Sequence, residues 1–491
     1  MHSKSPPNNS QIYYPILVQG IIAAGGAFAG TNPSYTQFEL EHALKISKAN
    51  FLIAEPEIFE APRTTALRLG LPAERILTLA EPDEIEDFHH GRYKSWRTLL
   101  SHGEQDWIRF DDLETCRSTP AFLLFSSGTT GLPKAAIQSH YNLIAQHTLV
   151  HENPKHPEPF HMSRIVCLPM FHTAIAGYTH ASTLRSVRES YIMRRFKLPE
   201  FLQYTERFKL TSMIIVPPMV VAIINAATED EALVRKHLAS VKNAVAGAAP
   251  LDPKTQANLQ RLLTPGTPFT QLWGMTETAC IGCYFYHPTH DDCGGSVGKF
   301  MPNLDVKLVD PDPDSDGEEV GPYDVRGELC IRGPTVIPGY FENPEANARD
   351  WDTDGYFHTG DIVYCNGKTK LWYVVDRRKE LIKVRGFQVA PNEVEGVLLS
   401  HPKITDAAVI GIPDVEAGSE LPRAYVVAAL DSGLTEDEVK VWIRERLARF
   451  KQLEGGVKFV ESIPKTVSGK ILKRVLREEA KKEAPAGASK L

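Results

Sequence analysis

Between about residues 12 and 300, short apolar runs suited to strands alternate with stretches of helical pattern. Six of these runs are NFLIAE, AFLLFS, RIVCLPM, TSMIIVP, NAVAGAAP and FTQLWG. Strands that alternate with helices favour a largely parallel, doubly wound sheet. We therefore expect an α/β fold, which is the strongest constraint that this sequence places on its architecture.

Two further parts follow this alternation. Between about residues 300 and 375, the short segments DVKLVD, GELCIRG, GYFHTGD and LWYVVD predict a compact β subdomain. We expect residues 1–375 to form one large N-terminal domain with doubly wound sheets. The charged connector 376–379 predicts a hinge, and 380–491 a small, mobile α+β C-terminal domain.

Local sequence signals predict the helices and strands of the C-terminal domain. Pro391 suits the first position of a helix, and Thr435 with Glu438 has the spacing of a capping box ahead of VKVWIRERL. AAVIGI and AYVVAAL are typical of strands, VKFVESIP predicts a final strand, and ILKRVLREEAKKE predicts a final helix.

Composition narrows the class of partner. The chain has 491 residues, 42% of them hydrophobic, so two or three cores are expected. A formal charge of -7 without long like-charge runs predicts no nucleic-acid footprint and no polybasic membrane patch. These features favour small-molecule chemistry.

The two ends of the chain carry opposing targeting signals. The apolar run at 16–30 is short, rich in glycine and interrupted by Gln19, so we predict no membrane span. Its alternative is a secretory signal, since Lys4 precedes it and Ala27-Phe28-Ala29 resembles a cleavage site. The last three residues, Ser489-Lys490-Leu491, match the peroxisomal address, so we predict a peroxisomal import receptor as partner. A tail without function is the alternative.

The seven cysteines are an odd number in a long chain, which suits a reducing compartment better than a disulfide framework. Cys280 and Cys283 have the C-x-x-C spacing of a zinc ribbon, with His287, His290 and Cys293 nearby. No second C-x-x-C occurs, and TACIGCYFYHP alternates like a strand. We therefore prefer a pocket wall to a zinc site.

The segment FLLFSSGTTGLPKAA, at 122–136, predicts a phosphate-binding loop. Gly128 and Gly131 allow a sharp turn close to a ligand, and Lys134 adds a mobile positive charge. The spacing does not match the P-loop of NTPases, and an ordinary polar turn is the alternative. The hydroxyl donors of this loop are Ser126, Ser127, Thr129 and Thr130.

Six motifs in order carry a family resemblance: FSSGTTGLPKAA, GAAPL, QLWGMTET, YFHTGDIV, VVDRRKELIKVRGFQVAPNEVE and IPKTVSGKILKR. Together they resemble the acyl-adenylate-forming superfamily, most closely the 4-coumarate CoA ligase-like acyl-CoA synthetases, over about residues 12–483. The resemblance implies a reaction with ATP, Mg²⁺ and coenzyme A as cofactors. A small carboxylic acid would be activated as acyl-AMP and then transferred to CoA.

The resemblance also assigns a nucleotide site. The loop at 126–134 would bind the β- and γ-phosphates, Thr276 the α-phosphate, and Glu277 with Thr129 the metal. A glutamate that caps a helix or faces water is the alternative for Glu277. The remaining implied nucleotide residues are Gly247, Ala248 and Ala249 at the adenine, Trp273 stacked on it, Gly274, and Asp361 with Arg377 at the ribose.

Four residues would serve the reacting centre. Lys470 would counter charge during adenylation, and His172 would lie beside the acyl carboxylate. A solvated lysine and a core histidine are the respective alternatives. Lys383 and Gln388 would serve the reaction centre and the CoA channel after rotation of the small domain about Lys379.

Departures from the family pattern concern the acyl pocket. Leu272 stands where the 4-coumarate ligases have glycine, and Cys280 and Ile281 replace usual wall residues, so the pocket should be shorter or redirected. Ala135 replaces a glycine and should be tolerated if its φ is negative. Only about fifteen residues precede the first matched segment, so we expect the first subdomain to lack elements.

The sequence thus predicts an AMP-forming acyl-CoA ligase for a medium-chain fatty or aromatic acid. Transfer to a carrier protein, or to oxygen as in luciferases, is one alternative, and a non-catalytic homologue is another. The identity of the acid, the pathway and the oligomeric state stay open at this point.

Overall fold

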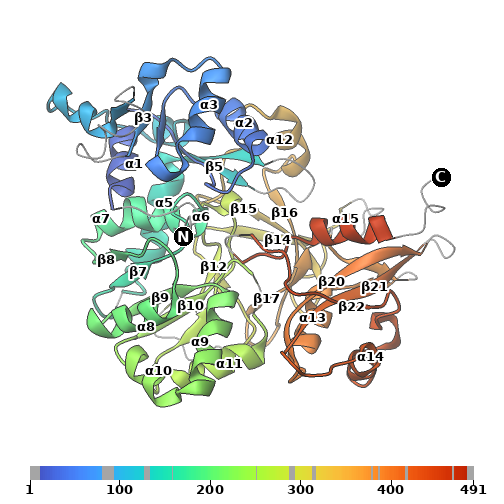
Figure 1. Cartoon of the computed structure of the whole chain (residues 1–491). Coiled ribbons are helices and arrows are strands. Elements are labelled where there is room, and N and C mark those ends of the chain that lie inside the picture. Colours follow the sequence, from blue (N-terminus) through green and yellow to red (C-terminus); the bar gives the residue numbers. More distant parts are fainter. Residues whose placement is uncertain are drawn as a thin grey trace.

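The computed structural model describes residues 12–79, 93–126, 133–157, 159–249, 251–286, 294–311, 317–377, 380–384, 387–414, 419–466 and 469–483, with the backbone alone at Lys383, Phe387 and Gln388. Figure 1 shows two masses, a large one from the N-terminal part and a smaller one, orange to red, from the C-terminal part. Within the described ranges, no helix is both long and apolar enough to span a membrane.

The large part alternates strands and helices, as the sequence predicts. Its strands are β1 (Phe28–Gly30), β2 (Leu52–Ala54), β3 (Ile76–Thr78), β4 (Lys94–Ser95), β5 (Pro120–Ser126), β6 (Lys134–Ser139), β7 (Arg164–Val166), β8 (Ser190–Ile192), β9 (Ser212–Ile215), β10 (Asn243–Ala246), β11 (Phe269–Gln271), β12 (Cys283–Tyr284) and β13 (Lys299–Phe300). Its α-helices are α1 (Tyr14–Ala23), α2 (Gln37–Ile46), α3 (Glu60–Arg68), α4 (Leu113–Ser118), α5 (His140–His151), α6 (Thr173–Gly177), α7 (Thr183–Arg185), α8 (Leu198–Arg207), α9 (Pro217–Glu229), α10 (Glu231–Leu238) and α11 (Pro253–Leu262). The π-helical turn η6 (Tyr178–Ser182) joins α6 to α7, and 3₁₀ turns are η1 (Pro56–Ile58), η2 (Ala73–Arg75), η5 (Trp96–His102) and η7 (Thr276–Thr278).

Parallel pairing dominates, but it is divided among several small sheets. Three of them have the orders β2-β3-β4, β7-β8 and β11-β10-β9, and all their pairs are parallel. A fourth, β1-β5-β6, is mixed, because β5 and β6 pair antiparallel, and a fifth, β12-β13, is antiparallel. The expected α/β architecture is therefore confirmed.

The β subdomain follows as a four-stranded antiparallel sheet of order β14-β15-β16-β17. Its strands are β14 (Asp305–Val309), β15 (Gly327–Arg332), β16 (Phe357–Cys365) and β17 (Trp372–Arg377), and α12 (Pro344–Asp350) lies between β15 and β16. Each of the four strands overlaps one of the segments that the sequence singled out, and β16 extends beyond its segment to Cys365. A buried cluster that includes Leu308, Leu329, Ile331, Phe357 and Trp273 joins this sheet to the preceding part.

The C-terminal part packs two helices and the final helix around a three-stranded sheet, β20-β21-β22. Its elements are β18 (Ile382–Val384), β19 (Phe387–Val389), α13 (Pro391–Leu399), β20 (Ile404–Asp414), β21 (Ser419–Ala428), α14 (Glu436–Arg444), η8 (Arg449–Lys451), β22 (Val457–Phe459) and α15 (Lys473–Glu483). Pro391 begins α13, and the Thr435–Glu438 capping box begins α14, so both helix starts are confirmed. The domain boundaries themselves stay predictions.

Two local expectations need correction. The strand expected over 278–288 is reduced to β12, because η7 and the turn after it place Ala279 and Cys280 at positive φ, which a strand does not permit. The final helix begins at Lys473 rather than Ile471, because Ile471 pairs with Lys465 in an isolated bridge. Ala135, by contrast, lies in β6 opposite Phe125 and has no positive φ, as expected.

Candidate active site

The glycine-rich segment connects two paired strands. Ser126 ends β5 and Lys134 begins β6, and the two residues are direct partners in the antiparallel register. The predicted phosphate-loop residues Ser127, Gly128, Thr129, Thr130 and Gly131 lie outside the described residues, so the structure describes only the two strand ends that flank them.

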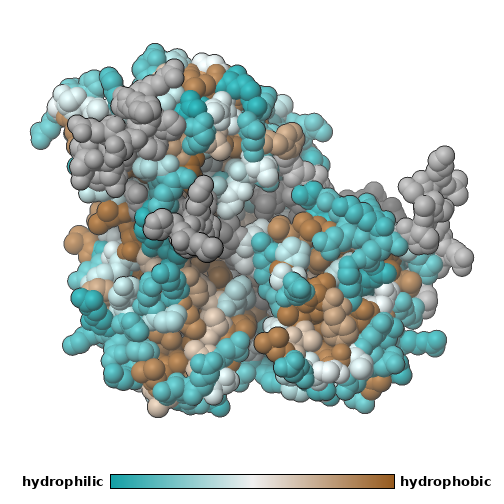
Figure 2. Space-filling model, in the orientation of Figure 1, coloured by the Kyte–Doolittle hydropathy of each residue, from teal (hydrophilic) through white to brown (hydrophobic). Residues whose placement is uncertain are grey.

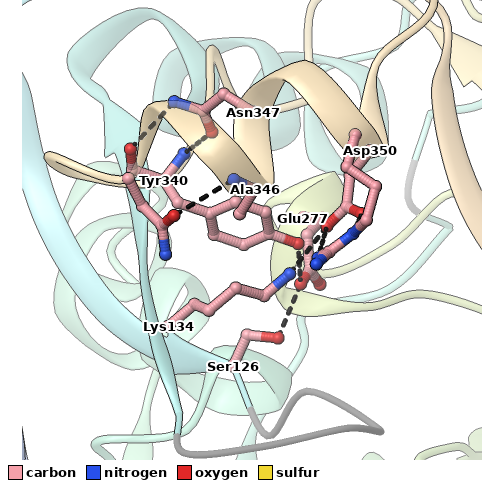
Figure 3. A network of polar contacts seen from close by, with 9 residues as sticks. Ser126, Lys134, Glu277, Tyr340, Ala346, Asn347 and Asp350 are labelled. Atoms are coloured by element: carbon pink, nitrogen blue, oxygen red, sulfur yellow. Dashed lines mark hydrogen bonds and ion pairs between the residues drawn. The ribbon is translucent and has the colours of Figure 1, made fainter.

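Glu277, the predicted metal ligand, lies at the base of this hairpin (Figure 3). Its side chain is only 4% exposed, on the short turn η7. One carboxylate oxygen, Oε1, accepts hydrogen bonds from the Ser126 hydroxyl at 2.6 Å and from the Tyr340 hydroxyl at 2.9 Å. Both donors are neutral hydroxyl groups, and within the described chain its Oε2 makes no hydrogen bond.

Lys134 lies on the other side of Tyr340 (Figure 3). Its Nζ is 3.7 Å from the centre of the tyrosine ring and 2.7 Å from Asp350 Oδ2. Burial opposes ionisation of Asp350, but hydrogen bonds from Arg349 and Lys134 lower its pKa overall. Asp350 thus holds the lysine ammonium beside the loop, within reach of an anion bound there.

Asp361, the predicted ribose ligand, is buried and held from two sides. Its Oδ2 accepts a hydrogen bond from the Trp273 indole at 2.8 Å, and its Oδ1 is 3.1 Å from Arg377 Nε. The Asp361 carboxylate raises the pKa of Arg377, so the guanidinium beside it stays protonated. Each oxygen retains a lone pair, and two such acceptors fit a pair of vicinal hydroxyls.

The Trp273 indole N–H donates a hydrogen bond to Asp361, a contact that the sequence did not predict. The indole is 7% exposed, and a side chain at Gly282 would come within 2.5 Å of its ring. Gly274 has no room for a Cβ, which would lie 1.6 Å from the Cys280 carbonyl oxygen. These glycines fix the tryptophan, and its stacking on adenine stays a prediction.

Lys470 brings the C-terminal part to this site. It follows Gly469, whose φ of +84° and contact with Pro218 leave no space for a side chain. Burial, and then the Arg377 guanidinium, lower the pKa of Lys470 to about 8, while the charges of Asp361 and Glu277 act in the opposite direction. The lysine therefore lies in the field of the same groups that surround the predicted nucleotide.

His172 lies close enough to Lys470 for the charge of the lysine to act on it. It caps α6, and its Nδ1 accepts a hydrogen bond from the Ala174 N–H at 3.2 Å. Burial, and then the charge of Lys470, lower the pKa of His172 to about 4. The neutral ring therefore carries its proton on Nε2, where it can be donated to an acyl oxygen.

The predicted acyl wall surrounds this histidine. The Cys280 thiol approaches the Ala174 carbonyl oxygen at 3.7 Å, and burial raises its pKa to about 12, so it is a wall thiol rather than a thiolate ligand. Leu272 packs against Gly247, where a Cβ would meet the leucine side chain at 2.9 Å. The described residues contain no cluster of metal-ligating side chains. His287, His290 and Cys293 fall outside them.

The structure gives fewer side-chain contacts for the remaining predicted residues. Thr276 opens η7, and its carbonyl oxygen accepts a hydrogen bond from Gln138. Ala248 is exposed with a φ of 72°, next to Ala249. Lys383 and Gln388 are paired across the β18–β19 hairpin, and Ile281 follows Cys280 in the wall. The hinge residue Lys379 lies outside the described chain.

Two functional candidates escaped the sequence analysis: Tyr340 and Asp350. Both come from the segment around α12, far along the chain from the hairpin that they contact. The one available signal was chemical, namely a tyrosine and an acidic residue in a turn-rich stretch just before YFHTGDIV. That signal does not reveal which partner either residue meets.

The residues present fit a magnesium ion. Mg²⁺ prefers hard oxygen ligands and keeps several waters. Glu277 is a buried carboxylate bound only by hydroxyl groups, and it forms no ion pair with a described Lys or Arg side chain. Glu277 would therefore hold the ion, with Thr129 as the predicted second ligand.

Comparison with known proteins gives an independent view of the whole chain. Residues 9–341 match the family model described as AMP-binding enzyme, and residues 393–470 match its C-terminal domain. The phenylacetyl-CoA ligase epaB of Aspergillus niger is 48% identical over 96% of this chain and 85% of its own length. The acyl-CoA synthetase ACTT5 of Alternaria alternata is also 48% identical, over 96% of this chain and 80% of its own.

More distant relatives agree with this result. The 4-coumarate–CoA ligase-like 9 protein of Oryza sativa is 35% identical over 95% of this chain and 81% of its own. The crystal structure of ATP-bound MatB from Rhodopseudomonas palustris is similar with a TM-score of 0.81 and 25% identity, over 96% of this chain and 87% of that one. The chain therefore belongs to the AMP-binding enzyme family of acyl-adenylate-forming enzymes and is an ATP-dependent, AMP-forming acyl-CoA ligase.

Proposed function

We propose that this ligase activates a compact medium-chain or aromatic carboxylic acid in the peroxisome, with Mg²⁺ as its metal ion. One observation carries the catalytic part of the proposal. The ammonium of Lys470, from the C-terminal part, senses the charges of Asp361 and Glu277 in the N-terminal part and that of Arg377 in the predicted hinge. Charged groups of this kind suit the binding of a nucleoside triphosphate and a carboxylic acid.

In the first half-reaction, a carboxylate oxygen of the acid forms a bond to the α-phosphorus of ATP. The bond from that phosphorus to the bridging oxygen breaks, and pyrophosphate leaves with the electron pair. Such transfers need alignment and charge neutralisation more than covalent help. Lys470 would stabilise charge at the α-phosphate, Lys134 would bind the departing phosphates, and Asp361 would orient the ribose. A magnesium ion at Glu277, when bound, neutralises phosphate charge.

In the second half-reaction, the CoA thiol attacks the acyl carbon and displaces AMP, so the Lys470 loop must make room. The β18–β19 hairpin carries Lys383 and Gln388 and belongs to the same C-terminal part. A rotation about the predicted hinge at 376–379 would exchange the lysine loop for this hairpin.

The pocket walls support a compact acid. Leu272 occupies space against Gly247, and Cys280 closes on Ala174, so a long chain has little room in this direction. The 48% identity to a protein named phenylacetyl-CoA ligase supports an aromatic acid in particular.

Peroxisomal location rests on the sequence Ser489-Lys490-Leu491 alone, which lies outside the described residues. A fluorescent fusion at the N-terminus should enter peroxisomes, and deletion of the last three residues should return it to the cytosol. Identical distributions of the two fusions would exclude this address.

The activity test separates the two half-reactions. Lys470→Ala should abolish pyrophosphate exchange into ATP, yet the variant should still convert supplied acyl-AMP and CoA to the thioester. Equal loss of both half-reactions would refute the role of Lys470. Failure of the native protein to support exchange with any acid of a broad panel would refute the proposed function itself.

A further inference from the structure

A buried glutamine on strand β6 contacts two segments of the predicted reacting centre. Gln138 lies four residues after Lys134, on the same face of the strand, and its side chain is 1% exposed. Its Nε2 donates hydrogen bonds to the Thr173 hydroxyl at 3.0 Å and to the Thr276 carbonyl oxygen at 3.1 Å. Because a side-chain amide has two N–H protons, each partner receives one of them. The sequence analysis did not single out this residue.

The two partners of this amide are expected to serve different substrates. Thr276 is the predicted contact of the α-phosphate, and Thr173 directly follows His172, the predicted contact of the acid. Thr173 is 6% exposed and begins α6. Within the ranges that the structure describes, no hydrogen bond joins Thr276 directly to the segment formed by His172 and Thr173. The amide of Gln138 therefore connects the nucleotide contact to the acid contact.

A polar side chain at this point of the strand needs a physical reason. The three preceding residues of β6 are alanine, alanine and isoleucine, and burying an amide costs free energy unless its hydrogen bonds are made. An apolar side chain at position 138 would avoid that cost, but it would also remove the connection between Thr173 and Thr276. The side chain of Gln138 is thus suited to hold two segments at a fixed distance.

The turn that carries Thr276 has a strained backbone. Thr276 opens η7, and the chain then passes through two residues at positive φ, 51° and 115°. Strained backbone persists only where the surrounding structure holds it in place.

Two glutamine side chains hold this turn. Gln138 binds the carbonyl oxygen at its start, that of Thr276. In the orientation that satisfies its amide, Gln146 of α5 donates to the carbonyl oxygens of Thr278 and Ile281, further along the turn. Of the two, Gln138 also reaches the acid side through Thr173, so it is the one that relates the turn to the second substrate.

We infer that Gln138 is a positioning residue that sets the distance between the α-phosphate of ATP and the carboxylate of the acid. The carboxylate oxygen must approach the α-phosphorus to about 3–3.5 Å, and a misplacement of about 1 Å can cost about 100-fold in rate. In acyl-AMP this oxygen is already bonded to phosphorus, so the protein no longer has to hold the distance. Gln138 therefore serves adenylation and not thioester formation. This inference rests on the proposed function and adds a residue to its first half-reaction.

Gln138→Leu tests the inference through the two half-reactions. The full chain is assayed with the acid that supports the fastest pyrophosphate exchange in the native protein, and with its acyl-AMP. Exchange should slow at least about tenfold, whereas conversion of supplied acyl-AMP and CoA to the thioester should stay within about twofold of the native rate. The ratio of the two rates is independent of the folded fraction, since both are measured in one preparation. A native ratio in this variant would overturn the inference.

Two further variants separate the hydrogen bonds from the shape of the side chain. Gln138→Glu keeps the size but has no N–H to donate, so it should lower the ratio of exchange to thioester formation as far as Gln138→Leu does. The matched control is Gln260→Leu on α11, which also removes an amide with two hydrogen bonds, to Thr267 and Phe269, and should leave the ratio unchanged. A native ratio in Gln138→Glu, or an equally lowered ratio in the control, would overturn the inference.

A double-mutant cycle tests the connection itself. Thr173→Val removes the hydroxyl that accepts from Gln138 and should also slow exchange. Because both substitutions break the same connection, the double variant Gln138→Leu/Thr173→Val should be no more than about threefold slower than the slower single variant. Losses that simply multiply would show that the two residues act independently and would overturn the inference.

Two failures are distinguishable in this design. Normal exchange by the native protein, together with a native ratio in Gln138→Leu, would overturn the positioning role alone. No pyrophosphate exchange by the native protein with any acid would overturn the proposed function, and the positioning role with it.

Discussion

Two buried glutamates in this molecule have opposite surroundings. Glu277, at the nucleotide side of the N-terminal part, is 4% exposed and bound by the hydroxyls of Ser126 and Tyr340. Glu395, in the C-terminal part, is 6% exposed, lies 3.0 Å from Lys473 Nζ and accepts the Val409 N–H at 2.8 Å. One charge is left for an incoming ion, and the other is neutralised within the fold.

We propose that this difference separates a carboxylate that binds a ligand from one that stabilises the fold. A buried charge is costly unless it is paired, so folds normally pair it. The Lys473 ammonium does this at the junction, where Glu380 and Asp376 are also close. The hydroxyl groups of Ser126 and Tyr340 orient Glu277 without forming an ion pair with it, which suits the metal ion predicted there.

The largest effect is expected at the ion pair between Lys473 and Glu395. Lys473→Met leaves Glu395 buried without its cation, and we expect the free energy of unfolding to fall by about 3–5 kcal/mol. Denaturant titration measures this change, and Lys481→Met on the exposed end of α15 is the matched control. A loss equal to that of the control would show that the pair is not structural.

Removing the carboxylate of Glu277 should lower activity and leave stability intact. Glu277→Gln should lower the rate of adenylation about 100-fold, or ~2.7 kcal/mol of transition-state stabilisation, because the metal loses its anionic ligand. Its stability should be unchanged or higher, since a buried unpaired charge is removed. Pyrophosphate exchange and thermal unfolding measure the two effects, and a large loss of stability would contradict this assignment.

A milder change tests the orienting hydroxyls. Tyr340→Phe removes one hydrogen bond to Glu277 but keeps the ring under Lys134, so adenylation should slow about tenfold. Titration of Mg²⁺ in the exchange assay should show a higher half-saturation concentration. Wild-type magnesium dependence in this variant would mean that the tyrosine does not position the carboxylate.

The smallest expected effect concerns pH. Burial and the charge of Arg377 lower the pKa of Lys470 to about 8, and the protonated form is the one required. The kcat/KM for adenylation should therefore be constant below this value and should fall by half at about pH 8 as the proton is lost. Lys470→Arg, which stays charged, should shift this fall in kcat/KM to higher pH. If the fall occurs at the same pH in the variant, another group is responsible for it.

The local structure was largely predictable. The apolar runs AFLLFS and NAVAGAAP give β5 and β10, and the signals at Pro391 and Thr435 give the starts of α13 and α14. These predictions succeed because burial periodicity and helix capping act within a few residues. The strand expected over 278–288 failed because tertiary contacts of the wall impose positive φ at Ala279 and Cys280.

The site was predictable in its residue types but not in its connections. Family motifs indicated Glu277, Asp361 and Lys470, yet nothing local showed that Tyr340 donates to Glu277 or that Trp273 donates to Asp361. Their partners lie 63 and 88 positions away along the chain. Such contacts depend on how whole sheets pack together.

The sequence by itself determined the order of strands and helices, the helix starts and the set of chemically competent side chains, because propensity, capping and side-chain chemistry are local properties. Only the tertiary structure decided which charges are cancelled and which are left available. Lys473 lies 3.0 Å from Glu395, whereas the described partners of the Glu277 carboxylate are hydroxyl groups, and that outcome depends on distances between segments that the chain brings together only when it folds.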